Sequence, residues 1–570
     1  MSMQSKKPTL VSWFKSGDPW VWMNAAAVSI SVIAVVGLLA VLAVNGFGHF
    51  WSKDIKQANY FVEGMDAPVI VTGEVVDVID VPSAQLISAG FTLDKNVDTY
   101  ERQLIKLGNR DVSGADFGWF LSKGFSQIQY PKELMVLERR EWGNFYGRLV
   151  AVKEGETVSS AVDIMEQNYD QVWDDFEHRL ARALRIHDEI YSIEKHAIGK
   201  INHGMERLRL KQRKMELDNP SAAERAVVMA DITSEAKVLD AQYAELESQL
   251  AQLYNAINRD SLIAKVGNGE ELIIPLAKIV RANRPNAMTL TEKVFEYFSK
   301  MWEFLSDDPR EANTEGGIFP AIFGTVLMVL LMTVIVSPLG VVAAIYLHEY
   351  AGNNALTKLL RIAVINLAGV PSIVYGVFGL GFFVYMVGGS LDQLFYPETL
   401  PSPTFGTPGV MWSAITLAIL TLPVVIVSTE EGLARIPSAM RHGSLALGAT
   451  KAETLWRIIL PIASPAIMTG IILAIARAAG EVAPLMLVGV VKMAPNLPLD
   501  GNFPFLHLDR KFMHLGFHIY DVGFQSPNVE AARPLVYATA LLLVTIIVSL
   551  NMTAVAIRNR LREKYRMLEH

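Results

Sequence analysis

The chain of 570 residues contains no cysteine. Thiol catalysis, cysteine-ligated zinc and disulfide bonds are therefore excluded, and a cysteine-free chain suits an oxidising compartment. No segment has the form G-x-x-x-x-G-K-[ST], so we do not expect ATP to bind through a P-loop. An excess of basic residues is also missing: 51 Lys and Arg against 58 Asp and Glu give a net charge of -7, which argues against nucleic-acid binding.

Half of the chain (51%) is hydrophobic, and six long stretches contain no charged residue or almost none. Each stretch can supply the roughly 20 helical residues that a bilayer core requires. A wholly soluble enzyme and a disordered chain are therefore excluded. We predict transmembrane helices at residues 22–46, 318–346, 362–389, 409–428, 462–490 and 534–557.

The distribution of basic residues predicts the orientation of these spans. The first span is too long, and lacks the cleavage pattern, to be a removable signal peptide, so it reads as a retained anchor. With six spans, both termini lie on one side. The segments on that side hold 14 Lys and Arg, against 4 in the short loops opposite, and basic residues are retained in the cytoplasm. We therefore predict that residues 1–21, 429–461 and 558–570 are cytoplasmic and that residues 47–317 are periplasmic.

The periplasmic insert is predicted to be an α+β domain. The run VIVTGEVVDVI at residues 69–79 is typical of short strands, within a small mixed domain over about 60–155. Two helices follow over about 159–259. Apolar residues at spacings of three and four form one seam along each helix, and Asn219-Pro220-Ser221 separates them. The pair is predicted to be a long antiparallel coiled-coil hairpin. A strand pair near 262–279 and an amphipathic helix at about 290–305 lead back to the membrane. The first seam comprises Val162, Met165, Tyr169, Val172 and Phe176, and the second comprises Leu239, Tyr243, Leu246, Leu250, Leu253 and Ile257.

No catalytic constellation is present, but two charges stand inside a predicted span. Arg477 and Glu481, in AIARAAGEVAPLM, are the only charged residues within the six predicted spans. An ionisable group in the bilayer costs about 3 kcal/mol or more unless it is paired or solvated, so it indicates a path or a partner. Four residues apart, the two would share a helical face. The alternative is a buried ion pair that only fixes helix packing.

The loop at 429–461 contains HGSLALGATKAETLWRIILP. We predict a short helix with exposed Leu445 and Leu447 that ends at Gly448 and docks a partner, because exposed apolar residues in a polar loop usually meet one. An amphipathic linker on the membrane surface is the alternative. Elsewhere, His507, His514 and His518 lack a partner with metal-ligand spacing, and we interpret them as solvated loop histidines.

These motifs resemble those of type I ABC importer permeases, whose coupling loop has E-A-A, three residues, a glycine, nine residues and I-x-L-P. The stretches MTGIILAIARAAGEVAPLML, NTEGGIFPAIFGTV and SPLGVVAAIYLHEYAG are similar to the PstA-like permeases of the bacterial high-affinity phosphate transporter. The resemblance covers residues 22–46 and about 313–570. His442-Gly443-Ser444 replaces E-A-A, so the pattern lacks the glutamate whose charge would contact the ATPase groove. Some 270 residues are inserted between the first two spans, where many relatives have a short segment.

The resemblance implies a mainly α membrane protein with six transmembrane helices of the type I ABC importer permease fold. The implied function is transport of inorganic phosphate across the lipid bilayer of the bacterial inner membrane. The resemblance implies neither enzyme activity nor a cofactor in this chain. The implied partners are a second permease similar to PstC, two copies of an ATPase similar to PstB, and a periplasmic phosphate-binding protein similar to PstS. Arg477 would meet phosphate and Glu481 would position it. The coupling residues would be His442, Gly443, Ser444, Leu445, Leu447, Gly448, Ile458, Leu460 and Pro461.

Two other classes stay open. An importer of another oxyanion or of an organic solute would keep the coupling loop but would not need the Arg477–Glu481 pair. A membrane sensor or scaffold would explain the anchor and the coiled coil but would not need five further spans. The role of the insert is open, with a preference for contact with the binding protein or the second permease.

Overall fold

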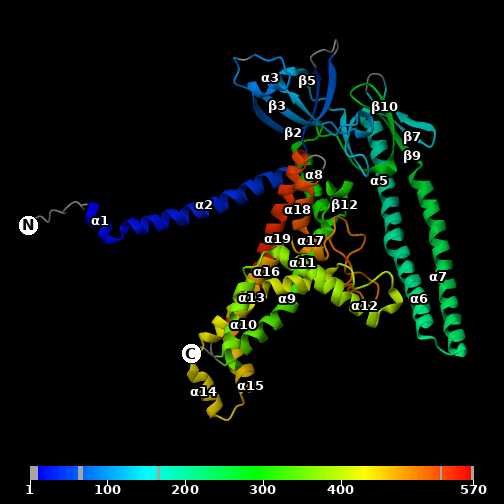
Figure 1. Cartoon of the computed structure of the whole chain (residues 1–570). Helices are drawn as coiled ribbons and strands as arrows, with labels where there is room; N and C mark the ends of the chain where they lie inside the picture. The colour runs from blue at the N-terminus through cyan, green and yellow to red at the C-terminus, as the bar shows by residue number, and fades with distance from the viewer. Residues whose placement is uncertain are drawn as a thin grey trace, which may run out of the picture.

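The computed structural model describes residues 10–61, 68–94, 96–163, 167–352, 354–526 and 529–565. Figure 1 shows three parts: a bundle of long helices, a β-rich region above one end of it, and a helical hairpin that descends beside the bundle. Helix α2 extends away from the bundle at the N-terminal end. Met165, which is predicted to belong to the first helical seam, lies outside the described residues.

Six helical segments of the described residues are long and apolar enough to cross a membrane, and the six predicted spans fall on them. The prediction rests on the length and apolar composition of these segments rather than on any motif. The segments are Asp18–Gly48 (α2), Phe319–Tyr350 (α9, Phe319–Ile345, with a π-helical turn), Ser372–Phe395 (α11, Ser372–Phe378, to α12, Gly389–Phe395), Val410–Ala434 (α13), Lys451–Gly480 (α15, Lys451–Thr454, to α16, Leu460–Gly480) and Ala532–Arg560 within α19 (Val529–Tyr565).

Three predicted boundaries are wrong. The span predicted at 362–389 begins inside a separate helix, α10 (Ala355–Leu367), and the spanning segment starts only at Ser372. Proline explains the break, because Pro371 lacks a backbone N–H and disfavours a helical residue before it. Helix α13 continues to Ala434, into the predicted loop at 429–461. The span predicted at 462–490 ends at Gly480, where Glu481 takes an extended backbone.

Helix α13 is the centre of the bundle and packs against α9 and α16. Small residues allow the close approach. A Cβ added to Gly340 of α9 would lie 2.6 Å from the side chain of Val425, and one added to Gly432 would lie 2.4 Å from Cβ of Ala466. Such small residues at helix crossings are the usual means by which membrane helices pack, since lipid supplies no hydrophobic force between them.

Two antiparallel sheets form the β-rich region. The first has the strand order β4-β3-β2-β1-β5 and the second has the order β10-β9-β7-β6-β11, with β8 beside β7. The predicted strand pair near 262–279 is present as β9 and β10, whereas β11 pairs with β6. The first sheet comprises β1 (Ile55–Tyr60), β2 (Val69–Pro82), β3 (Thr99–Lys106), β4 (Phe117–Leu121) and β5 (Phe125–Gln129); the second comprises β6 (Leu134–Arg139), β7 (Phe145–Glu154), β8 (Thr157–Ala161), β9 (Asp260–Lys265), β10 (Glu271–Pro275) and β11 (Ile279–Asn283).

The hairpin consists of α5 (Tyr169–Ser192), a π-helical turn, α6 (Gly199–Asp218) and α7 (Ala222–Ile257). Its turn lies where the sequence predicts it, with Asn219 left-handed (φ 47°) and Ser221 forming a capping box with Glu224. The predicted start at 159 is wrong, because residues 157–161 pair with β7 as a strand.

The first apolar seam packs on the second sheet as well as on the second seam, of which Leu250, Leu253 and Ile257 lie in the same core. Tyr169, Val172 and Phe176 are buried in a core with residues of the second sheet, such as Phe145 and Leu262. Further out, α6 does face α7: Lys211 pairs with Asp231 at 2.5 Å. The base of the hairpin is thus part of the β domain, and coiled-coil packing of its outer half stays a prediction.

The hairpin also contacts the loops of the helix bundle. Nε2 of His203 in α6 lies 3.0 Å from the carbonyl oxygen of Phe503, and the His203 ring meets that of His507 edge to face. Helix α6 also lies against the turn Pro397–Thr399. Figure 1 shows the pair passing the end of the bundle that carries α12. The insert therefore touches the bundle at two separated places, at its base and along α6.

Candidate functional site

Arg477 and Glu481 lie at the end of helix α16. Arg477 is in the last turn, and Glu481 is the residue that ends the helix, with φ -85° and ψ 122°. The prediction that both residues share a helical face is therefore wrong, because the backbone of Glu481 is extended rather than helical. The structure nevertheless brings the charges together, with Arg477 Nε 3.6 Å from Glu481 Oε1.

This pair is loose and partly open. The side chains of Arg477 and Glu481 are 34% and 22% exposed. The distance exceeds that of a hydrogen bond, and Arg477 Nε has no hydrogen-bond partner among the described residues although it is buried. A guanidinium presents a planar fork of donors that matches an oxyanion, and here that fork is not saturated by its carboxylate.

Other charges stand near the ends of the spans once the helices are seen in full. Helix α13 carries Glu430, which lies 3.5 Å from Arg361 of α10. Asp392 of α12 is fully buried and accepts backbone N–H bonds from Phe405 and Gly406. Arg477 and Glu481 are thus the only charges within the spans as predicted, but not within the longer helices. Sequence reasoning missed Asp392 because its partners are backbone N–H groups of the following loop, which no side-chain pattern indicates.

The loop at 429–461 forms a helix, a glycine turn and a second helix. Helix α14 (Ser438–Ala446) contains His442, Gly443 and Ser444, and Gly448 follows it with φ +89°. This left-handed backbone favours glycine. Leu447 is 91% exposed, and Leu445 is also exposed. A Cβ at Gly448 would meet nothing within 4 Å among the described residues, so these impose no steric constraint there.

The two halves of this loop are tied to each other and to the bundle. Ser444 Oγ lies 2.8 Å from Thr454 Oγ1, which joins α14 to α15. Arg441 donates to Glu349 at the end of α9 and to two backbone carbonyls. The I-x-L-P residues Ile458, Leu460 and Pro461 are half-buried at the start of α16. Movement of the loop would therefore be transmitted to both α9 and α16.

Trp456 belongs to the same surface and was missed by sequence reasoning. Its side chain is 75% exposed, in the π-helical turn between α15 and α16. Its neighbours Leu455 and Ile459 are buried, so this turn has one buried side and one exposed side. With Leu445 and Leu447, Trp456 gives the loop three large exposed apolar side chains.

The three histidines are buried, so their interpretation as solvated loop residues is wrong. His507 accepts or donates with Asp500 Oδ1 at 2.9 Å. His514 Nδ1 accepts the backbone N–H of Gly516 and so caps α18 (Leu515–Phe524). Burial lowers the pKa of His514 and of His518 to about 4, so both are neutral at neutral pH. The loop folds over them because it packs on α9 and α19, which the sequence did not indicate.

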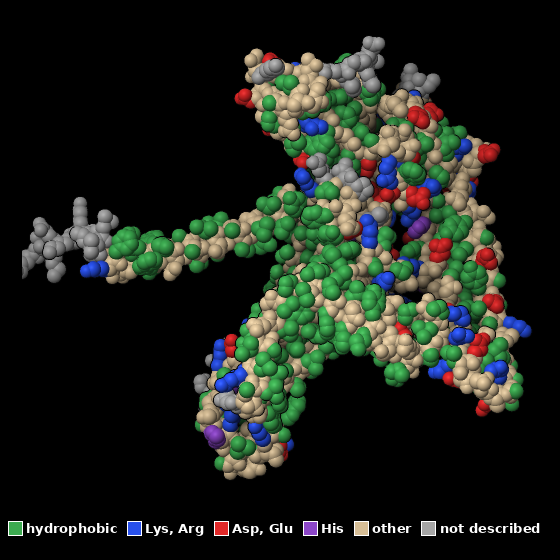
Figure 2. Space-filling model, in the orientation of Figure 1, with side chains coloured by type: hydrophobic (Ala, Val, Ile, Leu, Met, Phe, Trp, Pro, Cys, Tyr) green, Lys and Arg blue, Asp and Glu red, His purple; other side chains and the backbone are tan. Residues whose placement is uncertain are grey.

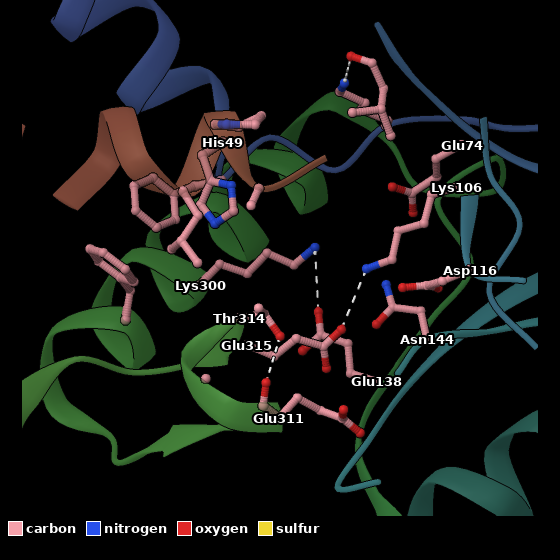
Figure 3. Close-up of a pocket in the computed structure, with 18 of the residues that line it drawn as sticks. His49, Glu74, Lys106, Asp116, Glu138, Asn144, Lys300, Glu311, Thr314 and Glu315 are labelled. Carbon is pink, nitrogen blue, oxygen red and sulfur yellow. Dashed lines mark hydrogen bonds and ion pairs between the residues drawn. The ribbon is translucent and has the colours of Figure 1, made fainter. Parts of the chain in front are cut away.

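A polar cavity of about 900 Å³ separates the β domain from the helix bundle (Figure 3). Lys106 of β3 and Lys300 of α8 (Leu290–Ser306) point toward its centre, and Glu138 of β6 and Glu315 lie between them. The lysines reach these carboxylates at 3.5 Å (Lys106–Glu315) and 3.8 Å (Lys300–Glu138). Four elements that are distant in sequence therefore meet in one ionic network.

The pKa values of the two carboxyl groups in this network are shifted in opposite directions. Burial, reinforced by the neighbouring Glu138, raises the pKa of Glu315. For Glu138 burial acts in the same direction, but Lys300 and Arg281 outweigh it and hold the pKa below its usual value. Glu315 precedes α9 by only a few residues. The network thus links both sheets to the start of a membrane helix, with cationic and anionic groups in near balance.

The comparisons with known proteins can now be set beside this geometry. Residues 336–563 match the family model for the "binding-protein-dependent transport system inner membrane component". That range holds the loop at 429–461, Arg477 and Glu481. The insert lies outside the matched range.

Relatives in three organisms match the same part of the chain. The probable ABC transporter permease protein YqgH of Bacillus subtilis is 34% identical over 202 residues, which are 35% of this chain and 62% of that protein. The phosphate transport system permease protein PstA 1 of Mycobacterium tuberculosis is 34% identical over 43% of this chain and 71% of its own length. PstA of Yersinia pestis is also 34% identical, over 44% of this chain and 75% of its own length.

Among solved structures, the MetNI methionine ABC transporter in its inward-facing conformation matches 46% of this chain and 98% of the other chain. The sequence identity is 16% and the TM-score is 0.33. At that score the likeness is too low to support an argument, and the inferences below rest on the family match, the sequence relatives and the geometry.

Proposed function

Because the chain belongs to the family of binding-protein-dependent transport system inner membrane components, we propose that it is the permease subunit of an ATP-driven importer that carries inorganic phosphate across the bacterial inner membrane. The six apolar helices supply the membrane part. The sequence has no P-loop, so ATP would be hydrolysed on a partner chain.

Within the chain itself, the choice of phosphate as substrate rests on the surroundings of Arg477. Its Nε has no hydrogen-bond partner among the described residues, Glu481 Oε1 lies 3.6 Å away, and the side chain is partly exposed. Phosphate loses hydration on entering a low-dielectric passage, and a guanidinium fork offsets that loss with charge-assisted hydrogen bonds. Glu481 would weaken the grip of Arg477, since a conducting site must also release its ion. The names of the two PstA relatives agree with this substrate.

The coupling role falls to the loop at 429–461. Its two most exposed large apolar side chains, Leu447 and Trp456, would enter a groove of the ATPase. The bonds from Arg441 to Glu349, and the continuation of α15 into α16, would carry a displacement of that groove into two spanning helices. His442, Gly443 and Ser444 lie in the second turn of this docking helix.

The partners proposed are a second permease similar to PstC, two copies of an ATPase similar to PstB, and a binding protein similar to PstS. Both termini would be cytoplasmic and residues 47–317 periplasmic, from the basic residues of the short loops. The hairpin would then lie on the periplasmic face, where α6 contacts the loops at 397–399 and 503–507. That position favours contact with the delivering binding protein or the second permease.

Uptake of labelled phosphate tests the proposal. Cells that lack this chain, but keep its proposed partners, should regain high-affinity uptake when the chain is restored. Unlabelled phosphate should compete, whereas sulfate and molybdate in excess should not. Restored uptake of sulfate or of an organic solute, with none of phosphate, would assign the chain to another importer. No restored uptake of any solute, despite assembly with an ATPase, would favour a sensor or scaffold.

A further inference from the structure

Helix α8 (Leu290–Ser306) carries three aromatic side chains that nothing in the described structure covers. Phe295, Phe298 and Trp302 are 72%, 56% and 70% exposed. Their spacing of three and four places them on one face of the helix. Leu290 and Val294, near the start of the helix, are exposed as well. Large exposed aromatic patches mark an interaction surface rather than a face that meets water.

Four charged side chains of this helix point the other way, into the protein, whereas Glu292 in the first turn is exposed and caps the helix with Thr289. Glu296 pairs with Arg281 at 3.0 Å, Glu303 pairs with Arg310 at 2.7 Å, and Lys293 pairs with Asp54 at 2.5 Å. A fourth group, Lys300, donates to Ser52 Oγ. A helix at a water-exposed surface turns its charged residues outward. Helix α8 has the reverse arrangement, so the medium that it faces is apolar.

The aromatic face lies at the end of a membrane-spanning helix. Phe50, just beyond α2, packs on Phe304 with ring centroids 5.2 Å apart, and Trp51 packs on Tyr297 at 6.3 Å. Trp51 and Phe47 are themselves exposed. Figure 2 shows the hydrophobic surface of α2 continuing onto the body of the bundle. Because Tyr297 in turn contacts Phe298 with ring centroids 5.5 Å apart, the aromatic face lies beside the membrane end of α2.

We propose that α8 is an interfacial helix whose Phe295, Phe298 and Trp302 insert into the lipid of the adjacent leaflet, at the level of the headgroups. Aromatic side chains favour this zone, where an apolar ring meets lipid and the polar side stays outside it. The insert would thereby be fixed to the membrane surface as well as to the helix bundle. This inference rests on the membrane placement of the chain and is independent of the identity of the transported solute.

Site-directed spin labelling tests the proposal, because a chain without cysteine accepts single labels cleanly. Phe295→Cys, Phe298→Cys and Trp302→Cys are labelled in the full chain, assembled with its partner subunits in nanodiscs cut from native membrane. Val238→Cys, at an exposed apolar position on α7, is the matched control. Collision rates with oxygen, which concentrates in lipid, and with a water-soluble nickel chelate are then measured.

The expected result is an oxygen-to-nickel ratio several-fold higher at the three α8 positions than at position 238. Labels that collide with neither reagent and are immobile would show a protein partner on this face, and ratios equal to the control would show water; either result overturns the proposal. A second measurement keeps the aromatic face intact: the fluorescence difference between wild type and Trp302→Phe isolates Trp302. Lipids brominated near the headgroup should quench that difference signal, and no quenching would contradict insertion.

Discussion

At the scale of single residues, the end of helix α16 decides the transport hypothesis. Arg477→Ala should abolish or severely reduce phosphate uptake while the complex still assembles, because the change removes the only cation of the pair and leaves Glu481 to repel an anion. Arg477→Lys keeps the charge but loses the fork, so partial uptake is expected. Uptake is normalised to the amount of assembled complex. Leu473→Ala, at an exposed position one turn earlier on α16, is the control and should transport normally.

The double variant Arg477→Ala/Glu481→Gln separates transport from packing. If Arg477 serves the anion, this variant should assemble like wild type and still fail to transport. An ion pair that only packs helices can be replaced by two neutral residues with function kept. Near-wild-type uptake in the double variant would therefore remove Arg477 from the pathway.

Gly448 tests the coupling loop. Its left-handed backbone costs a residue with a side chain about 1 kcal/mol, and none of the described residues lies near a Cβ there. Gly448→Arg should therefore leave the chain folded but reduce both co-purification of the ATPase and phosphate-stimulated ATP hydrolysis. Gly448→Asn is the control, since asparagine tolerates the left-handed region, and it should be milder. Normal coupling in Gly448→Arg would mean that the docking surface lies elsewhere.

The buried histidines predict a pH dependence of stability. His514 has a pKa of about 4 in the folded chain, below its ordinary 6.5, so the unfolded chain takes up the proton first. Its stabilising effect is therefore complete above pH 6.5 and is lost as the pH falls toward 4, by about 3 kcal/mol. The thermal midpoint in nanodiscs should decrease over this range. His514→Asn keeps the helix cap and should flatten the decrease; an unchanged slope would assign the acid sensitivity to other groups.

At the scale of elements, the hairpin divides into a structural base and a free outer half. Its base shares a core with the second sheet, and Tyr254 donates to Glu194 across the pair. Deleting the whole predicted hairpin, 159–259, would remove β8 and part of that core. A deletion of 199–243, closed by a short Gly/Ser linker, removes α6 and the facing part of α7 alone.

This shorter deletion should leave membrane insertion intact, because each span carries its own topogenic signal. Phosphate uptake at limiting concentration should fall if the outer half contacts the binding protein or the second permease. The matched control is His203→Ala, which removes only the side-chain contacts with Phe503 and His507 and should have a smaller effect. Fully normal uptake after the deletion would leave the hairpin as a spacer or a regulatory element.

At the scale of the whole molecule, the orientation in the membrane is a prediction from loop charges. Two exposed alanines on opposite sides test it: Ala223→Cys near the hairpin tip and Ala446→Cys in the coupling loop. A membrane-impermeant maleimide added to intact spheroplasts should label position 223 and not position 446. Permeabilised cells should label both. Labelling of position 446 in sealed spheroplasts would reverse the topology.

The sequence by itself determined the membrane character, the six spanning segments, the turn at 219–221 and the left-handed glycine at 448. The physical reason is local: a bilayer selects apolar length, and a turn or a helix end depends on the few residues that form it. The amphipathic helix at about 290–305 follows from the same local periodicity and is present as α8.

Only the tertiary structure decided which side chains meet. Pro371 explains the break in the helix locally. The apolar run over 362–389 does not show that α10 packs as a helix separate from the span. The first hairpin seam turned to a sheet assembled from strands more than 80 residues apart, such as β7 and β9. His514 and His518 are buried where α18 packs on α9 and α19, and the Lys106–Glu315 pair joins two elements about 200 residues apart. Such contacts depend on long-range chain closure, for which hydrophobic periodicity carries no signal.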